Sequence, residues 1–212
     1  MIPDPTLSLP DFPRPDWGPA IEALVERREV VLPGILPPAC WQALRAEAVA
    51  LRDWAGFQEA RIGRGSHTHQ DTAVRGDALC WLDADMPAGA AYLRWMDSLR
   101  EVLNRELFLG LSEFEAHYAH YPAGAFYRRH VDRHLDSNAR VVSAVFYLNP
   151  DWPADAGGEL VMYARDGEQE RYRQRPEGGT LVLFMSDDMP HEVLPATQAR
   201  WSIAGWFRTR SL

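Results

Sequence analysis

Short runs of β-branched and aromatic residues, separated by turn sequences, fill the chain after residue 111 and limit the folds that it can adopt. They span residues 112–121, 140–149, 159–164, 169–174, 179–185 and 200–207. Residues 17–28, 36–54 and 86–107 instead place apolar side chains at helical spacing, which predicts helices. Helices followed by several strands indicate an α+β fold whose strands form a sandwich or barrel.

Length, charge, apolar runs and cysteine content indicate which classes of protein this chain can belong to. The 212 residues suit one domain, 1–212, and the proline-rich residues 1–16 predict an extended arm. A net charge of −8 disfavours nucleic acid as a partner. No apolar run resembles a signal peptide or approaches the roughly 18 residues of a membrane span. Cys40 and Cys80 have no zinc-finger spacing to histidine and suit a reducing compartment. We therefore expect a cytoplasmic protein that does not contact membranes.

Three residues are candidates for a metal site. His130 and Asp132 alternate, and residues two apart on a strand point to the same face. His191 is the best candidate for a third ligand, on a later strand. Two histidines and a carboxylate form the triad of non-haem Fe(II) oxygenases, although zinc hydrolysis is a rival use. Arg200 favours the oxygenase, because a buried guanidinium can clamp one carboxylate of 2-oxoglutarate.

These residues lie within longer motifs. The stretches "YPAGAFYRRHVD", "FYLNPDWPADAGGEL" and "SDDMPHEVLPATQARWSIAGWF", with "VRGDALCWL" upstream, closely resemble prolyl 4-hydroxylases of the oxygen-sensing (EGL-nine) type and their bacterial relatives. That family belongs to the 2-oxoglutarate and Fe(II)-dependent dioxygenases, and the likeness covers about residues 57–209. The resemblance implies a double-stranded β-helix (jelly-roll) core with N-terminal helices packed on one sheet.

The resemblance also implies a role for each site residue, with no catalytic residue beyond the metal ligands. It assigns Fe(II) to His130, Asp132 and His191. It assigns the co-substrate 2-oxoglutarate to Arg200, Tyr147 and Tyr121. It assigns the substrate to Tyr127, Arg140, Trp206 and Asp77. O₂ is the second co-substrate, and ascorbate is a candidate stimulant.

The implied function is hydroxylation of a prolyl residue in a protein substrate, with decarboxylation of 2-oxoglutarate to succinate and CO₂. A translation elongation factor is the first candidate, because bacterial relatives hydroxylate one. The alternatives are a hydroxylase of a free amino acid or other small molecule, a nucleic-acid demethylase and a metal-binding sensor without turnover. The long polar loop 61–77 favours a larger partner. We expect Asp77 to pair with Arg140 to close this loop, and we expect a monomer.

Overall fold

The computed structural model describes residues 9–54, 56–59, 74–132 and 139–210. The helices are α1 (Gly18–Arg27), α2 (Pro38–Asp53) and α3 (Pro87–Leu107). The strands are β1 (Glu29–Leu32), β2 (Gln58–Glu59), β3 (Ala78–Trp81), β4 (Glu113–Tyr121), β5 (Tyr127–His130), β6 (Arg140–Tyr147), β7 (Leu160–Tyr163), β8 (Glu170–Gln174), β9 (Leu181–Met185), β10 (His191–Val193) and β11 (Arg200–Arg208).

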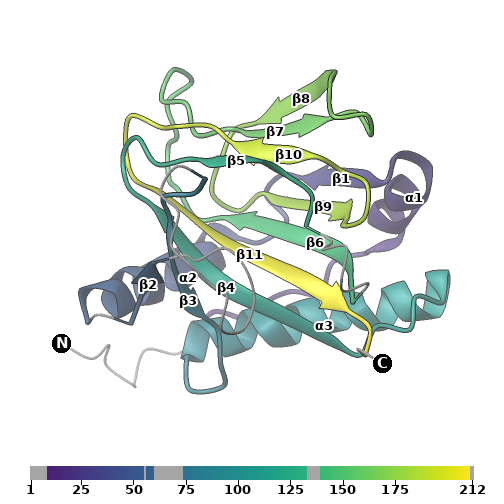
Figure 1. Ribbon diagram of the computed structural model, residues 1–212. Coiled ribbons are helices and arrows are strands. Elements are labelled where there is room, and N and C mark those ends of the chain that lie inside the picture. Colours follow the sequence, from purple (N-terminus) through teal and green to yellow (C-terminus); the bar gives the residue numbers. More distant parts are fainter. Residues whose placement is uncertain (1–8, 55, 60–73, 133–138, 211–212) are drawn as a thin grey trace.

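The strands form two antiparallel sheets that face each other. The larger sheet has the order β1-β9-β6-β11-β4-β3-β2, and the smaller has the order β5-β10-β7-β8. From β4 to β7 and again from β8 to β11, successive strands alternate between the sheets, as β4 to β5 and β9 to β10 do (Figure 1). This is the arrangement of a double-stranded β-helix, or jelly roll.

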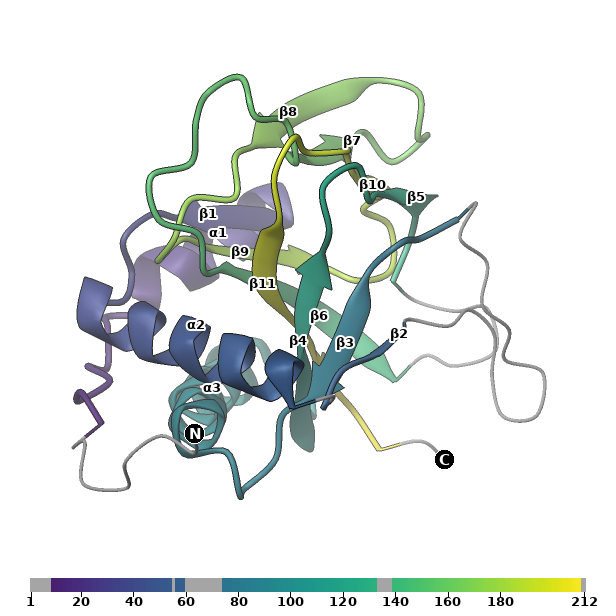
Figure 2. The same ribbon diagram turned by 90° about the vertical axis from the view of Figure 1, so that its left-hand side faces the viewer.

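The helices cover the outer face of the larger sheet. Figure 2 shows α2 and α3 lying side by side against it, with the smaller sheet on the opposite side. Each helix has a proline in its first turn, where the missing N–H costs no hydrogen bond. The main core lies between these helices and the sheet, and its fully buried members include Leu44, Tyr92, Leu99, Phe146 and Ile203.

Strand β11 shows how the larger sheet separates core from pocket. Trp201, Ile203 and Phe207 pack into the helix-side core. The alternate positions Arg200, Ser202, Ala204 and Trp206 line a pocket between the two sheets. The side-chain period of two on a strand therefore directs one set of residues to the core and the other set, which includes Arg200 and Ser202, to the pocket.

The predicted elements agree with the structure to within two residues at each end, and the α+β prediction with helices packed on one sheet is confirmed. Two local features differ from the sequence analysis. Strand β1 was not predicted, because its four residues follow α1 directly and are too few to show a period. Strand β5 ends at His130, so Asp132 lies just beyond the strand rather than on it.

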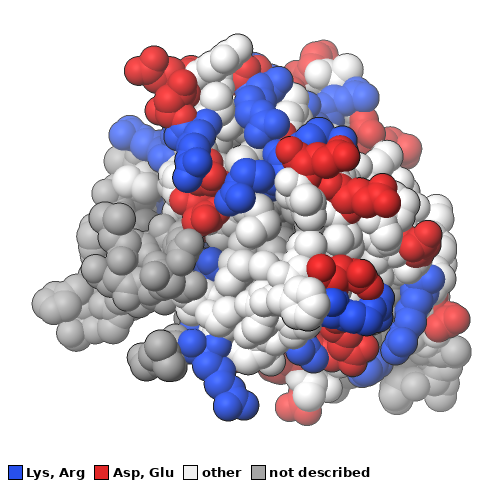
Figure 3. Space-filling model, turned by 90° about the vertical axis from the view of Figure 1, so that its right-hand side faces the viewer, with Lys and Arg blue, Asp and Glu red and all other residues white. Residues whose placement is uncertain are grey.

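Charges of both signs are interspersed on the surface. Figure 3 shows basic and acidic side chains side by side on one face of the molecule. Several surface charges form ion pairs, including Arg28–Asp187 at 2.6 Å and Arg175–Glu177 at 2.7 Å. Within the described ranges, no helix combines the length and apolar character that crossing a bilayer requires.

Candidate metal centre and pocket

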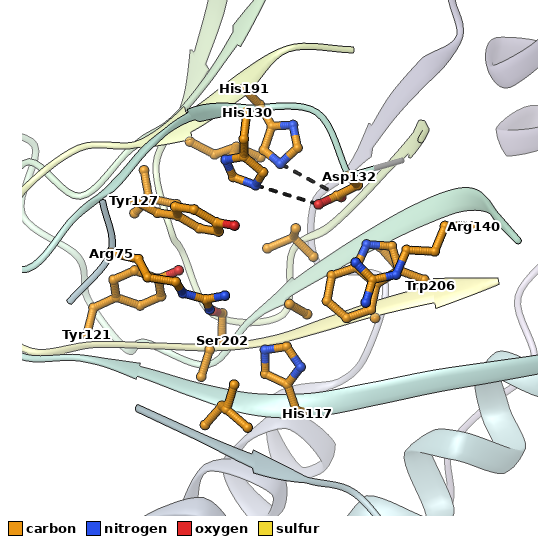
Figure 4. A pocket seen from close by; sticks show the side chains of 18 of the residues that line it. Arg75, His117, Tyr121, Tyr127, His130, Asp132, Arg140, His191, Ser202 and Trp206 are labelled. Carbon is orange, nitrogen blue, oxygen red and sulfur yellow. Dashed lines mark ion pairs between the residues drawn. The ribbon is translucent and has the colours of Figure 1, made fainter. Parts of the chain in front are cut away.

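A pocket of about 470 Å³ lies between the two sheets. The larger sheet contributes residues of β4 and β11 to its wall, and the smaller sheet contributes residues of β5 and β10. Figure 4 shows His130, His191 and Asp132 gathered at one side of the cavity, with His117 at the opposite side. Eight of the ten residues predicted for the site line this cavity, and the other two are Tyr147 and Asp77.

The three predicted metal ligands lie together. Strand pairing explains this, because His191 on β10 is the direct cross-strand partner of His130 on β5. The His130 Nε2 atom lies 3.6 Å from Asp132 Oδ1, and the His191 Nε2 atom lies 3.8 Å from Asp132 Oδ2. One ligand atom from each residue lies within 4.8 Å of the others. The smaller sheet and the turn after β5 thus bring together ligands 61 residues apart in the chain (191 − 130).

Backbone carbonyls orient both imidazoles. His130 Nδ1 lies 2.8 Å from the Arg128 oxygen, and His191 Nδ1 lies 2.9 Å from the Met189 oxygen. A carbonyl only accepts, so each Nδ1 carries the proton and each Nε2 presents its lone pair to the cluster. Burial, followed by the neighbouring His130, lowers the pKa of His191 to about 4. The His191 ring is therefore neutral at pH 7, as a metal ligand must be.

One serine bonds to the Asp132 carboxylate directly, and a second serine bonds to the first. Ser143 Oγ donates to Asp132 Oδ2 at 2.7 Å and lies 2.8 Å from Ser186 Oγ. Burial opposes the charged carboxylate, but His191, His130 and the Ser143 hydroxyl outweigh it and hold the pKa of Asp132 well below its usual range. The carboxylate is therefore ionised and fixed in orientation at neutral pH.

This donor set fits Fe(II). Two imidazole nitrogens and one carboxylate oxygen are the facial triad of non-haem iron oxygenases, which leaves coordination positions for other ligands. In the part of the chain that the structure describes, no other group of three His, Cys, Asp or Glu side chains is close enough to bind a metal.

Arg200 fits a carboxylate ligand. Its side chain is 1 % exposed, donates from Nε to the Gly158 oxygen at 3.0 Å, and donates from one terminal nitrogen to Ser202 Oγ at 3.2 Å. No carboxylate of the described residues pairs with it. Burying a charge without a counter-charge is unfavourable in free energy. An anionic ligand bound to Arg200 would offset this unfavourable free energy.

Two tyrosines flank the Arg200 guanidinium. The Tyr147 ring centre lies 5.2 Å from it and the Tyr121 ring centre 5.0 Å, and Tyr121 is its cross-strand partner. The Tyr147 hydroxyl is buried and has no hydrogen-bond partner. Burial raises the pKa of Tyr147 to about 12 although the Arg200 cation opposes this, so the hydroxyl keeps its proton and can donate. These groups fit one end of a dicarboxylate such as 2-oxoglutarate.

Tyr127 lies between the metal ligands and a cation. Its ring stacks on His130, with centroids 3.7 Å apart and planes at 18°. The Arg75 guanidinium lies 4.4 Å from the centre of the same ring. Tyr127 therefore contacts both a metal ligand and the segment that follows the loop.

The remaining predicted residues line the pocket or lie close behind it. Arg140 stacks 3.6 Å from the Trp206 ring centre, and its guanidinium also lies 3.4 Å from Glu115. Asp77 is 4 % exposed and accepts two hydrogen bonds from Arg75, at 2.7 and 2.6 Å. The expected pair between Asp77 and Arg140 is not formed, because Arg75 occupies both carboxylate oxygens.

Sequence reasoning gave no role to His117, which lines the pocket, nor to three residues that hydrogen-bond to predicted site residues. The first of these three is Arg75, in the motif "VRGDALCWL". The other two are Ser143 and Ser202, and each is a buried hydroxyl between two apolar neighbours on its strand. A polar residue at an inward strand position was the available signal, since buried hydroxyls need partners. Most of the predicted loop 61–77 lies outside the described residues, which resume at residue 74.

Comparisons with known proteins agree with this geometry. The 2OG-Fe(II) oxygenase superfamily matches residues 116–208, which include all three candidate metal ligands and Arg200. Egl nine homolog 1 of Rattus norvegicus is 29% identical over 175 residues, covering 78% of this chain and 51% of that protein. This chain thus spans about half the length of the curated relatives that it matches first.

Two solved structures extend the match over most of the chain. A Pseudomonas putida prolyl-4-hydroxylase is 41% identical, with a TM-score of 0.81, over 90% of this chain and 97% of that one. A Trichoplax adhaerens prolyl hydroxylase, solved with a hypoxia inducible factor peptide fragment, is 26% identical, with a TM-score of 0.79, over 89% of this chain and 86% of that one. The fold, the His-Asp-His cluster and these matches agree, and the chain belongs to the 2OG-Fe(II) oxygenase superfamily, among relatives of the prolyl hydroxylases.

Proposed function

We propose that this protein hydroxylates a prolyl residue in a protein substrate, using Fe(II), 2-oxoglutarate and O₂. The observation that carries the proposal is the buried Arg200 guanidinium, without a carboxylate partner, in the same pocket as the His-Asp-His cluster. A zinc hydrolase needs no such cation, whereas a co-substrate with two carboxylates does. We assign His130, Asp132 and His191 as the ligands of Fe(II).

The chain's own residues bind and orient the reactants. Arg200 and Tyr147 hold the distal carboxylate of 2-oxoglutarate, and Tyr121 hydrogen-bonds the co-substrate nearer the metal. Ser143 keeps Asp132 ionised and in place. When bound, Fe(II) and 2-oxoglutarate supply the oxidising chemistry, in which 2-oxoglutarate and O₂ are converted to succinate and CO₂ as the substrate gains a hydroxyl. The buried walls exclude water from this step.

The substrate side of the pocket is aromatic and cationic. Tyr127, Arg140 and Trp206 line it, and Asp77 supports it through Arg75. Flat aromatic surfaces suit the apolar ring of proline. A protein segment is favoured over a free amino acid because the Trichoplax adhaerens relative was solved with a peptide fragment. A translation elongation factor is our first candidate substrate, from the likeness to bacterial relatives, and we expect the protein to act as a cytoplasmic monomer.

Succinate formation tests the proposal. The purified protein is incubated with Fe(II), 2-oxoglutarate, ascorbate and a candidate elongation factor, and the same factor with its prolines replaced serves as the control. We expect succinate above the basal level, and a mass gain of one oxygen atom on a single proline-containing peptide. His191→Ala should abolish both signals. Stimulation by free L-proline but by no protein would instead favour the small-molecule hydroxylase.

A further inference from the structure

His117 is a pocket residue that has no role in the proposed chemistry so far. It lies on β4, its side chain is almost fully buried, and it lines the same cavity as the metal ligands. Figure 4 shows its imidazole across the cavity from His130 and His191, pointing into the pocket. Its Nδ1 atom is buried and has no hydrogen-bond partner. Such a group costs free energy unless a ligand supplies the missing partner.

The ring of His117 is held in one orientation. Trp81, its cross-strand partner on β3, meets it edge-on with ring centroids 5.0 Å apart. Trp206 lies against it at 5.5 Å. On the other neighbouring strand its partner is Ala204, a small residue that lines the same pocket. A ligand could therefore contact His117 without first having to order the side chain.

The imidazole is neutral at pH 7. Burial lowers the pKa of His117 to about 4, the cations Arg75 and Arg140 add to this effect, and the carboxylates Asp77 and Asp132 oppose it. A neutral imidazole offers one N–H donor and one nitrogen acceptor. It therefore suits a neutral group that both donates and accepts hydrogen bonds, and it has no charge to offer a carboxylate.

We propose that His117 determines specificity by forming a hydrogen bond to a peptide group next to the target proline. This inference rests on the proposed prolyl hydroxylation. The proline ring has no hydrogen-bonding group, so aromatic walls such as Trp81 and Trp206 can contact it but cannot hold it in register. The peptide group on its carboxyl side has both a donor and an acceptor, which matches the neutral imidazole.

His120 provides a matched control on the same strand. It is also almost fully buried, and neither of its ring nitrogens has a hydrogen-bond partner. Its ring lies against Trp201, with centroids 4.3 Å apart and planes tilted by 53°, on the helix side of the larger sheet. It does not line the pocket among the described residues. Replacing it should disturb β4 about as much as replacing His117 while leaving the ligand surface unchanged.

The experiment measures binding of N-acetyl-L-prolinamide, which carries a peptide group on each side of one proline. Tryptophan fluorescence follows the titration, with Zn²⁺ and 2-oxoglutarate present so that no turnover occurs. We expect His117→Leu to weaken probe binding about tenfold, the usual effect of losing one hydrogen bond. His117→Gln should retain most of the affinity, and His120→Leu should match the wild type. The affinity for 2-oxoglutarate should not change in any variant.

Three other outcomes would contradict the role of His117 or the proposed substrate. Wild-type probe affinity in a folded His117→Leu protein would overturn the inference and leave the proposed function standing. A loss of 2-oxoglutarate affinity in that variant would also overturn it, because the co-substrate would then be the partner. If the wild type bound 2-oxoglutarate but no probe, the prolyl substrate itself would be refuted. Should His117→Leu not fold, His117→Met replaces it, since Met also lacks a hydrogen-bonding nitrogen and is more adaptable.

Discussion

At the metal centre, the orientation of one carboxylate depends on a hydroxyl that is not itself a ligand. Ser143 donates to Asp132 at 2.7 Å and is linked to Ser186. Groups that orient metal ligands typically contribute about 10–100-fold to metal affinity. We expect Ser143→Ala to weaken Mn²⁺ binding, measured by calorimetry, by about tenfold or more. Ser98→Ala, which removes a buried hydroxyl bonded to the Trp95 carbonyl in α3, is the control. Equal Mn²⁺ affinities would show that Asp132 needs no such support.

At the co-substrate site, the residue whose substitution is most informative is Arg200. Its guanidinium is buried, and Tyr147 beside it has an unpaired hydroxyl. Removing one partner of a buried charge pair costs about 2–5 kcal/mol. Arg200→Ala should therefore weaken 2-oxoglutarate binding to the Mn²⁺-loaded protein by that amount, while Mn²⁺ affinity persists. Arg200→Lys should recover only part of the loss, because an ammonium lacks the planar fork.

The control for that substitution is Arg45→Ala. Arg45 is a partly buried arginine that donates to the Leu148 carbonyl at 3.0 Å and lies outside the pocket. It should leave 2-oxoglutarate binding unchanged. An unaltered affinity in Arg200→Ala, measured by calorimetry, would mean that another group binds the distal carboxylate.

At the scale of elements, periodicity was informative wherever a segment was long enough to show it. The alternation along β4 and β11 separates Tyr118 and Ile203 in the helix-side core from Tyr121 and Arg200 in the pocket. Cross-strand register was not available from the sequence. It decides that His191 pairs with His130, and the local geometry around residue 75 decides that Asp77 pairs with Arg75. The Asp77 prediction failed because a partner two residues away competes well with a distant one.

Strand β4 also makes stability depend on pH. Burial is the main cause that lowers the pKa values of His117 and His120 to about 4, with Arg45 and Arg52 adding to the effect at His120. The stability that these neutral histidines contribute is fully present above their unfolded-state pKa of 6.5. It is lost as the pH falls toward their folded-state pKa of about 4. On acidification from pH 7 to pH 5, each of these two histidines should lower the free energy of unfolding by about 2 kcal/mol.

Urea unfolding at these two pH values measures the effect. The wild type should lose free energy of unfolding on acidification, and His120→Gln, which cannot be protonated, should lose less. Comparing the slopes of the urea transitions at the two pH values checks that unfolding stays two-state. If both proteins lost the same free energy, His120 would not contribute to the pH dependence.

For the whole molecule, the two sheets divide the proposed site between them. His130 and His191 belong to the smaller sheet, whereas Arg200, Tyr121 and Tyr147 belong to the larger. Residue types and spacing predicted His130, His191 and Arg200, and a family resemblance added Tyr121 and Tyr147. Their separation follows from strands that alternate between sheets. A co-substrate held at the metal and at Arg200 would link the sheets. Binding energy at the site should therefore stabilise the entire fold and not one loop.

Thermal unfolding tests this linkage. A ligand at about 100 times its dissociation constant stabilises the folded state by about 2.7 kcal/mol. For a chain of 212 residues, each kcal/mol raises Tm by about 2–4 °C. We expect 2-oxoglutarate to raise the Tm of the Mn²⁺-loaded protein by about 5–10 °C beyond the shift from Mn²⁺ alone. Arg200→Ala should keep the shift from Mn²⁺ and lose the second, and His191→Ala should lose most of both. A full 2-oxoglutarate shift in Arg200→Ala, or in protein treated with a chelator, would contradict a co-substrate that bridges the two sheets.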